Sequence, residues 1–548
     1  MNETSVARSA LTGEVPIRLW APLPLLGLPW VLLGIWLGHA RGPQSLSAFV
    51  ASVALMLFLV AMATRTWRLF YLAQLPVLLV SAAFATYTLT YGTPPGDLFA
   101  YVLATSSWEE IRGFFGIWQG ERLLLAGGAL AATYLVLAAC APGRSMFSAR
   151  ARGRLVFLAV VAVLGAFAAL RPVALLQGFA INPGFGTILF VAGPLAHARS
   201  AVNGTAVRKV SYGATRVLTK EVHILVIGES ARRDSWSVYG YRRQTTPYLE
   251  KLQKDGEAVF FQDAVADANF TACVVPILLT GMDPGHFDMS RIRGNIVDLA
   301  EEAGYSTAWL MNQDPHISLL SGVHADRMLY PPSVSTLLNA HLPFDERLLP
   351  ELRRQLDGGS GPRFIGLHII GSHWQYDSRY PASFERFGSG KGLNYWSALS
   401  ARSDPRILDA YDNSLLYTDW FLGQVIEEAR KLTVPATVTY LSDHGEDIYA
   451  LDGQAGHGTS TYSKHQFEIP AFIWMNAAYR STHPDKVRAI KENADKEIRS
   501  HNVFFSEADV MGIQWPGAKP SQSYASPGFV PDTESPLIAG GVLVSPAE

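Results

Sequence analysis

The chain has 548 residues, which is long enough for two or three domains. It carries 45 basic and 47 acidic residues, so its net charge of −2 leaves no basic field for a nucleic acid. The charges are unevenly spread, because only 18 of them lie within residues 1–180. The composition excludes a nucleic acid as partner, and it predicts a first part of different character from the rest.

The first part contains stretches that are long and apolar enough to cross a bilayer. A hydrocarbon core of ~30 Å needs about 20 helical residues. We predict five transmembrane helices, which span about residues 19–40, 42–64, 69–93, 123–143 and 155–171. Residues 1–172 are therefore expected to form a five-helix transmembrane domain.

The arginines predict how this domain is oriented. Cytoplasmic loops retain Lys and Arg, and arginines occur before the first expected helix, between the second and third, and between the fourth and fifth. Residues 172–198 are also free of Asp, Glu, Lys and Arg, and as a sixth span they would return the chain to the cytoplasm. We disfavour this sixth span, because the prolines and glycines of the segment would leave backbone polar groups unsatisfied in lipid. We expect residues 173–220 to be an interfacial linker, and an odd number of spans then exports residues 221–548.

The exported part has the pattern of an α/β domain with a mostly parallel sheet. Short β-rich runs alternate with polar, helix-like segments. The strands are predicted at Val222–Ile227, Ala258–Phe261, Ser306–Leu310, Phe364–Ile370 and Ala436–Leu441. The helices are predicted at Pro247–Asp255, Ile296–Ala303 and Ile407–Lys431, and residues 519–548 are expected to be irregular.

Side chains of the kind that bind metals follow three of these strands. Glu229 follows the first strand, His373 follows the fourth, and Asp443 and His444 follow the fifth. Ligands of open α/β sheets bind beyond the carboxyl ends of the strands, so these side chains are expected to converge. An Asp beside a His suits zinc or a similar divalent ion.

A catalytic metal of this kind commonly assists the deprotonation of a reacting hydroxyl group. Ser230 is one candidate for this hydroxyl, because it follows Glu229 directly. Thr271, after the segment 261–270, is another, and spacing alone does not choose between them.

Five ordered motifs give the chain a recognisable pattern. They are VIGESARRDSWSVYGY at 226–241, LHIIGSHWQYDSRYP at 367–381, YDNSLLYTD at 411–419, SDHGE at 442–446 and GHGT at 456–459. With these motifs and its hydrophobic front half, the chain resembles the phosphoethanolamine transferases, membrane-anchored members of the alkaline phosphatase and sulfatase superfamily. The resemblance implies a multi-pass protein of the bacterial inner membrane whose catalytic domain, residues 221–548, lies in the periplasm.

The resemblance also implies roles for individual residues. Glu229, Thr271, Asp443 and His444 would bind one tightly held zinc ion, with Thr271 as the nucleophile that becomes phosphorylated. His373 and His457 match a second pair of catalytic histidines, which face the phosphoryl group or a second zinc ion. Asn312 would contact the substrate together with these two histidines.

The implied reaction transfers phosphoethanolamine from the membrane lipid phosphatidylethanolamine to a glycolipid or glycan of the cell envelope, lipid A or its core sugars, through a phosphothreonine. The protein is expected to act as a monomer. A phosphoglycerol transferase of the same superfamily and a non-catalytic membrane sensor or scaffold are the alternatives. A sulfatase needs Cys or Ser followed by x-Pro-x-Arg, whereas Cys273 is followed by Val-Val-Pro without a nearby arginine.

Overall fold

The computed structural model divides into two compact units, of which the first comprises residues 1–96 and 114–196 and the second residues 97–113 and 197–548. The residues it describes are 120–141, parts of 49–75, and 210–545 apart from 218–219, 289–291, 314–321, 331–343, 359–360, 390–404, 449–455 and 459–461.

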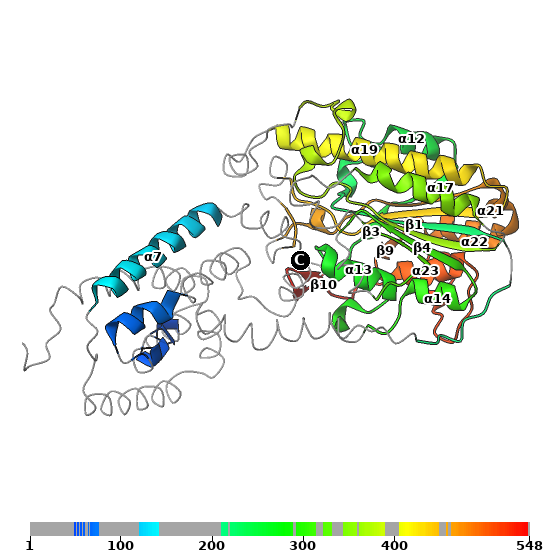
Figure 1. Cartoon of the computed structure of the whole chain (residues 1–548). Helices are drawn as coiled ribbons and strands as arrows, with labels where there is room; N and C mark the ends of the chain where they lie inside the picture. Colours follow the sequence, from blue (N-terminus) through cyan, green and yellow to red (C-terminus); the bar gives the residue numbers. More distant parts are fainter. Residues whose placement is uncertain are drawn as a thin grey trace, which may run out of the picture. The chain divides into compact units, whose positions relative to one another are not determined.

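In the first unit, helix α7 (Gly120–Cys140) coincides with the fourth expected span (Figure 1). It packs against the segment around residue 70, where the rings of Tyr71 and Tyr134 meet at 5.7 Å and Arg68 Nε donates to the Ala138 carbonyl at 3.1 Å. The expected spans 19–40 and 155–171 lie outside the described residues, as do parts of 42–64 and 69–93. None of the described helices is both long and apolar enough to cross a membrane.

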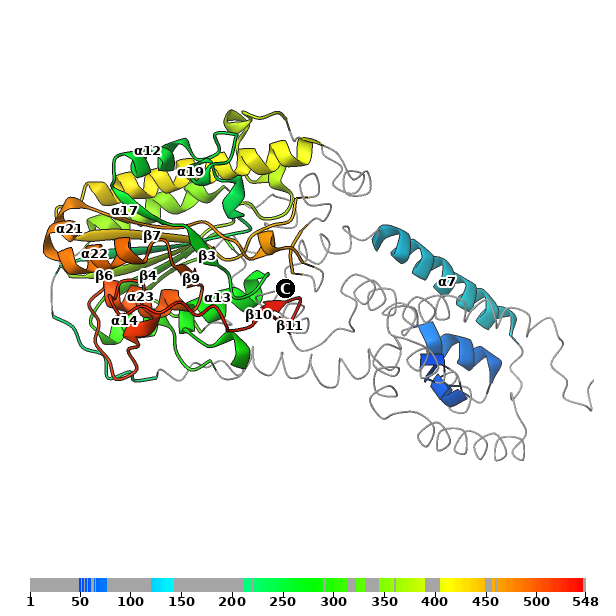
Figure 2. The ribbon, with the colours of Figure 1, turned by 180° about the vertical axis from the view of Figure 1, so that it is seen from behind.

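The second unit is built on a seven-stranded sheet in the order β2-β8-β7-β1-β6-β4-β5 (Figures 1 and 2). Its strands are β1 (Val222–Gly228), β2 (Ala258–Phe261), β4 (Ser306–Met311), β5 (Arg327–Leu329), β6 (Arg363–His368), β7 (Ala436–Ser442) and β8 (Ala471–Met475). Strand β8 runs antiparallel to both its neighbours, whereas all other pairs are parallel. The prediction of a mostly parallel sheet is confirmed, and all five predicted strands belong to it.

Helices cover both faces of this sheet (Figures 1 and 2). On one face lie α12 (Pro247–Lys254), α17 (Leu349–Asp357) and α19 (Pro405–Arg430), and on the other α13 (Thr271–Thr280), α14 (Ile296–Glu302) and α23 (Asn502–Val510). Two further helices, α21 (Ala477–Thr482) and α22 (Pro484–Asn493), follow β8. Burial of apolar side chains between the helices and the sheet forms one large core.

The C-terminal residues contradict the expectation of an irregular tail. Strands β10 (Leu537–Ala539) and β11 (Val542–Val544) form an antiparallel hairpin. The Ile538 amide donates to the Asp267 carbonyl at 2.9 Å, and the Gly540 amide donates to Asn269 Oδ1 at 3.0 Å. The hairpin therefore braces the segment that leads into α13. A second small sheet pairs β3 (Asp263–Val265) with β9 (Glu497–Arg499) in parallel.

Glu507 on α23 predicts a pH dependence of stability. Burial raises the pKa of this carboxyl group from 4.5 to about 7, although hydroxyl groups of Thr439 and Tyr524 oppose the shift. Because the folded state holds the proton while the unfolded state loses it, stability should fall as pH rises from 4.5 to 7, by about 3 kcal/mol. Glu507→Gln should remove this fall, so its melting temperature should gain on that of the native chain between pH 5 and 7.5. If the melting temperatures of the two proteins changed by the same amount between pH 5 and 7.5, Glu507 would not be the cause of the pH dependence.

Candidate metal centre

The register of the parallel strands brings the conspicuous residues together at one edge of the sheet. Gly228 of β1 pairs with Ser442 of β7, so Glu229 and Asp443 follow neighbouring strands at the same level. Both side chains are buried, and a buried carboxylate needs a cation or hydrogen-bond donors. The ends of β1 and β7 lie side by side, as predicted.

Asp443 is held so that one of its oxygens remains available. Its Oδ1 accepts from the backbone amides of Ser230, at 3.1 Å, and His444, at 2.7 Å. Its Oδ2 is buried and has no hydrogen-bond partner among the described residues. Ser230 reaches this position with a φ of 54°, in the left-handed region that only a constrained turn imposes on a non-glycine residue.

The ring of His444 is oriented in the same way. Its Nδ1 donates to the Gly445 carbonyl at 2.8 Å, so the neutral ring presents the lone pair of Nε2. This Nε2 lies 3.4 Å from Glu229 Oε1 and 3.5 Å from Asp443 Oδ2. Burial lowers the pKa of His444 despite the nearby charge of Asp443, which favours the neutral, metal-binding form.

Thr271 completes this cluster from the first residue of α13. Its hydroxyl donates to Glu229 Oε2 at 3.1 Å and lies 3.3 Å from His444 Nε2. The start of a helix carries free backbone amides and a positive dipole end, which favour an alkoxide and a bound phosphoryl group. The Ser230 hydroxyl also donates to this carboxylate, to Glu229 Oε1 at 2.6 Å, but of the two candidate hydroxyls only that of Thr271 also lies 3.3 Å from His444 Nε2.

These residues fit a divalent cation. Burial, and then the charge of Asp443, raise the pKa of Glu229 well above its usual range. The two negative charges repel each other, so both carboxylates stay ionised only if a positive charge lies between them. The two carboxylates and the Nε2 lone pair of His444 form a donor set typical of zinc, and the Thr271 hydroxyl lies beside them. Ligand atoms of Glu229, His444 and His457 also lie within 4.8 Å of one another, so His457 borders the same position.

The second pair of histidines lies beside the first cluster. The ring centroids of His457 and His444 are 4.1 Å apart, and those of His457 and His373 are 6.3 Å apart. His457 Nδ1 contacts Glu446 Oε2 at 2.5 Å, and Tyr376 donates to the other Glu446 oxygen at 2.5 Å. Burial acts to lower the pKa of His457, but the charge and the hydrogen bond of Glu446 outweigh it and raise that pKa.

Three partners in this site were not identified from the sequence. Gln313, next to Asn312, donates to Glu229 Oε2 at 2.7 Å. Asn312 itself donates to Asp345 Oδ1 at 2.9 Å, and Asp345 also accepts from the amides of Ile370 and Gly371 in the segment before His373. Glu446 is the third, and its place in the SDHGE motif was the available signal.

Gly445, between His444 and Glu446, allows a close approach of two backbone segments. A Cβ at this position would lie 2.0 Å from the His465 carbonyl oxygen. We therefore expect Gly445→Ala to displace the ligand-bearing loop and to lower both activity and melting temperature, with a loss of stability of about 1–3 kcal/mol. Gly361→Ala is a matched control, because a Cβ there meets no atom within 4 Å. Equal thermal unfolding of the two variants would refute this account of the loop.

The second unit is thus an α/β domain whose mostly parallel sheet carries a cluster of metal-binding side chain types beyond the ends of two neighbouring strands. A family model described as sulfatase matches residues 222–513, more than half of the chain, and the chain therefore belongs to the sulfatase family. Over 314 residues the chain is 26% identical to phosphoethanolamine transferase EptC of Escherichia coli K12. The matched region covers 56% of this chain and 53% of that protein. The match thus spans about half the length of this curated relative.

Solved structures give the same assignment of fold. The zinc complex of the C-terminal periplasmic domain of Escherichia coli EptC has a TM-score of 0.53 at 23% identity, over 61% of this chain and 96% of that chain. The integral membrane protein EptA of Neisseria meningitidis, a lipooligosaccharide phosphoethanolamine transferase, has a TM-score of 0.64 at 21% identity, over 90% of this chain and 97% of that chain. The resemblance to phosphoethanolamine transferases that the motifs indicated is confirmed.

Proposed function

We propose that the chain is a membrane-anchored, zinc-dependent phosphoethanolamine transferase. It takes phosphoethanolamine from phosphatidylethanolamine and passes it to a glycolipid or glycan of the cell envelope. The observation that carries the proposal is the Thr271 hydroxyl at the start of α13, within hydrogen-bond distance of buried Glu229 and beside His444. The similarity to relatives named phosphoethanolamine transferases supports the choice of transferred group.

The proposal includes the setting of the site. Five transmembrane helices within residues 1–172 anchor the catalytic domain at the periplasmic face of the inner membrane, which places it beside the headgroups of its lipid donor. The zinc-bound relative and the donor set of Glu229, Thr271, Asp443 and His444 support a zinc ion at this position. When bound, zinc would supply positive charge to the Thr271 oxygen and to the non-bridging oxygens of the phosphate.

The reaction proceeds in two half-reactions. In the first, the Thr271 hydroxyl releases its proton to solvent, its oxygen attacks the phosphorus, a phosphothreonine ester forms, and the bond to the diacylglycerol oxygen breaks. In the second, an acceptor oxygen attacks the same phosphorus, the bond to the Thr271 oxygen breaks, and that oxygen takes up a proton from solvent. In this proposal His457, whose Nδ1 contacts Glu446, gives a proton to the leaving diacylglycerol and takes one from the acceptor.

A single experiment tests this function and separates it from its alternatives. The full chain in detergent is incubated with phosphatidylethanolamine or phosphatidylglycerol, and released diacylglycerol and the mass of the Thr271 peptide are measured. We expect release from phosphatidylethanolamine and a peptide heavier by one phosphoethanolamine group. Release from phosphatidylglycerol alone would identify a phosphoglycerol transferase, and neither release nor modification would favour a sensor or scaffold.

A further inference from the structure

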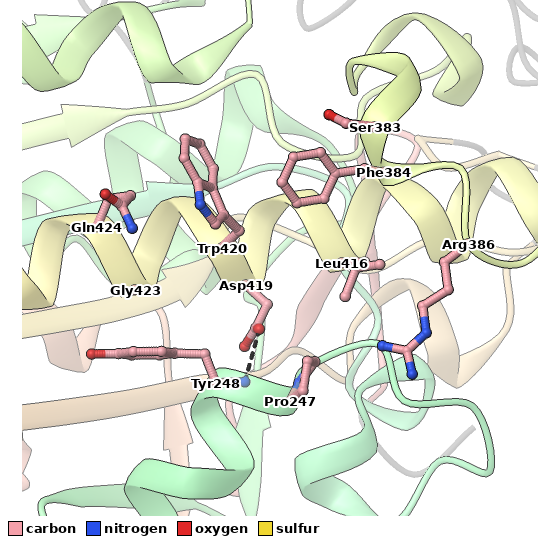
Figure 3. Close-up of a pocket in the computed structure, with 10 residues that line it drawn as sticks. All are labelled: Pro247, Tyr248, Ser383, Phe384, Arg386, Leu416, Asp419, Trp420, Gly423 and Gln424. Carbon is pink, nitrogen blue, oxygen red and sulfur yellow. Dashed lines mark hydrogen bonds between the residues drawn. The ribbon is translucent and has the colours of Figure 1, made fainter.

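A groove on the outer side of the second unit lies apart from the metal centre. Its volume is about 460 Å³, within the range of small-molecule sites. Three segments line it: the start of α12, the short helix η9 (Ala382–Phe384) with the residues after it, and the middle of α19. Figure 3 shows the ten lining residues, with the rings of Phe384 and Trp420 standing close together beside α19.

The aromatic side chains that line this groove are held in place by contacts with neighbouring residues. Trp420 stacks on Tyr417 with ring centroids 5.5 Å apart, and its other neighbour Phe384 meets it edge-on at 5.6 Å. Tyr248 lies over Gly423, where a Cβ would come within 3.1 Å of its ring, and its hydroxyl donates to Glu427 at 2.7 Å. These rings are pre-organised surfaces, so a ligand that stacks on them loses little side-chain entropy.

The polar groups of the groove do not form a second set of metal ligands. Its one carboxylate, Asp419, accepts from the backbone amides of Tyr248 and Leu249 at 2.9 and 3.0 Å, which caps α12 (Figure 3). Arg386 is exposed, donates to Gln244 at 3.2 Å, and forms no ion pair with any carboxylate among the described residues. The groove thus combines an exposed arginine, without an ion-pair partner among the described residues, with flat apolar surfaces.

We infer that this groove binds a phosphorylated saccharide, and the identity of that ligand as part of the acceptor rests on the proposed function. The C–H face of a sugar ring fits the rings of Trp420 and Tyr248, while its hydroxyls meet Gln424 and Ser383. The guanidinium of Arg386 complements a phosphate group, with which it forms charge-assisted hydrogen bonds. A lipid chain would leave these polar groups without partners.

The groove lies along the helix that also reaches the metal centre. Tyr411 of α19 donates its hydroxyl to the Ser230 carbonyl at 2.8 Å, and Trp420 is farther along the same helix. At ~1.5 Å per residue, the two are about 14 Å apart along the axis. A short oligosaccharide could cover this separation, so the groove is suited to hold a glycan acceptor by a sugar that is not the one modified.

The test measures binding of glucose 1-phosphate to the full chain in detergent by saturation-transfer NMR, with glucose and inorganic phosphate as reference probes. We expect Trp420→Ala to weaken binding of the sugar phosphate about tenfold or more, and Arg386→Gln to weaken it about tenfold without affecting glucose. Arg488→Gln, an exposed arginine on α22, is the matched control and should bind as the native chain does. Circular dichroism checks that the variants are folded.

The outcomes separate this inference from the proposed function. Release of diacylglycerol from phosphatidylethanolamine without acceptor should be the same in the native chain and in both groove variants. If the native chain fails to release diacylglycerol, the proposed function is wrong, whatever the groove binds. If release is normal but neither variant weakens sugar phosphate binding, the groove inference is overturned. It is also overturned if the variants lose binding to phosphatidylglycerol vesicles and keep binding to the sugar phosphate.

Discussion

Thr271→Ala is expected to abolish transfer, lowering the rate by about 10⁴-fold or more, because it removes the atom that forms the covalent intermediate. The loss should affect the first half-reaction, so neither diacylglycerol nor a modified peptide should appear. The hydroxyl donates to Glu229 and lies beside His444, so no other described hydroxyl has the same position. Diacylglycerol release from phosphatidylethanolamine is the measurement, with the peptide mass as a second readout.

Two companion variants make this prediction specific. Thr271→Ser keeps the hydroxyl and should retain measurable transfer, which a purely structural role of the threonine methyl group would not explain. Ser230→Ala should reduce activity less than Thr271→Ala, because the Ser230 hydroxyl supports Glu229 at 2.6 Å rather than facing the reacting position. If Thr271→Ala turned over and Ser230→Ala did not, the nucleophile would be Ser230.

The strands that carry the site could be predicted because their sequences are short runs rich in apolar and β-branched residues. Strands β1, β6 and β7 are buried along their whole length in the middle of a parallel sheet, and such strands have few alternatives. Their carboxyl ends then had to lie at one edge, so the order of residues along the chain was enough to place Glu229, Asp443 and His444 together.

Helix α13 could not be predicted in this way. Its sequence, TACVVPILLT, contains two valines and Pro276, a composition typical of a strand or a break rather than a helix. The helix forms because its residues from Cys273 to Leu279 are all buried in the core, so tertiary packing outweighs local preference. The place of Thr271 at a helix start therefore came only from the three-dimensional structure.

The hydrogen bonds that support the site residues could not be predicted from the sequence either, for a different reason. Gln313 reaches Glu229, and Tyr376 reaches Glu446, across 84 and 70 positions of the chain. Neither residue type nor spacing marks such partners, because the same side chains on a surface would simply be solvated. The resemblance to a family supplied the proposed ligands but not the residues that contact them.

Zinc should stabilise the native chain, and Asp443→Asn should remove this effect. Without a cation the buried carboxylates of Glu229 and Asp443 face each other, and the charge of Asp443 contributes to the raised pKa of Glu229. A zinc concentration 100 times the dissociation constant would add about 2.7 kcal/mol of stability, or about 5 °C in melting temperature. Asp443→Asn keeps the two backbone hydrogen bonds to Oδ1 but loses the charge on Oδ2, so it should bind less zinc and show little thermal response.

Melting curves with and without zinc, together with elemental analysis, measure both effects. Asp419→Asn is the matched control, because Asp419 is also a buried carboxylate that accepts two backbone amides, at the start of α12. It should melt at a lower temperature than the native chain yet keep the full response to zinc, since it touches none of the ligands. A native chain that is free of metal and still releases diacylglycerol would show that the buried carboxylates serve the reaction in another way.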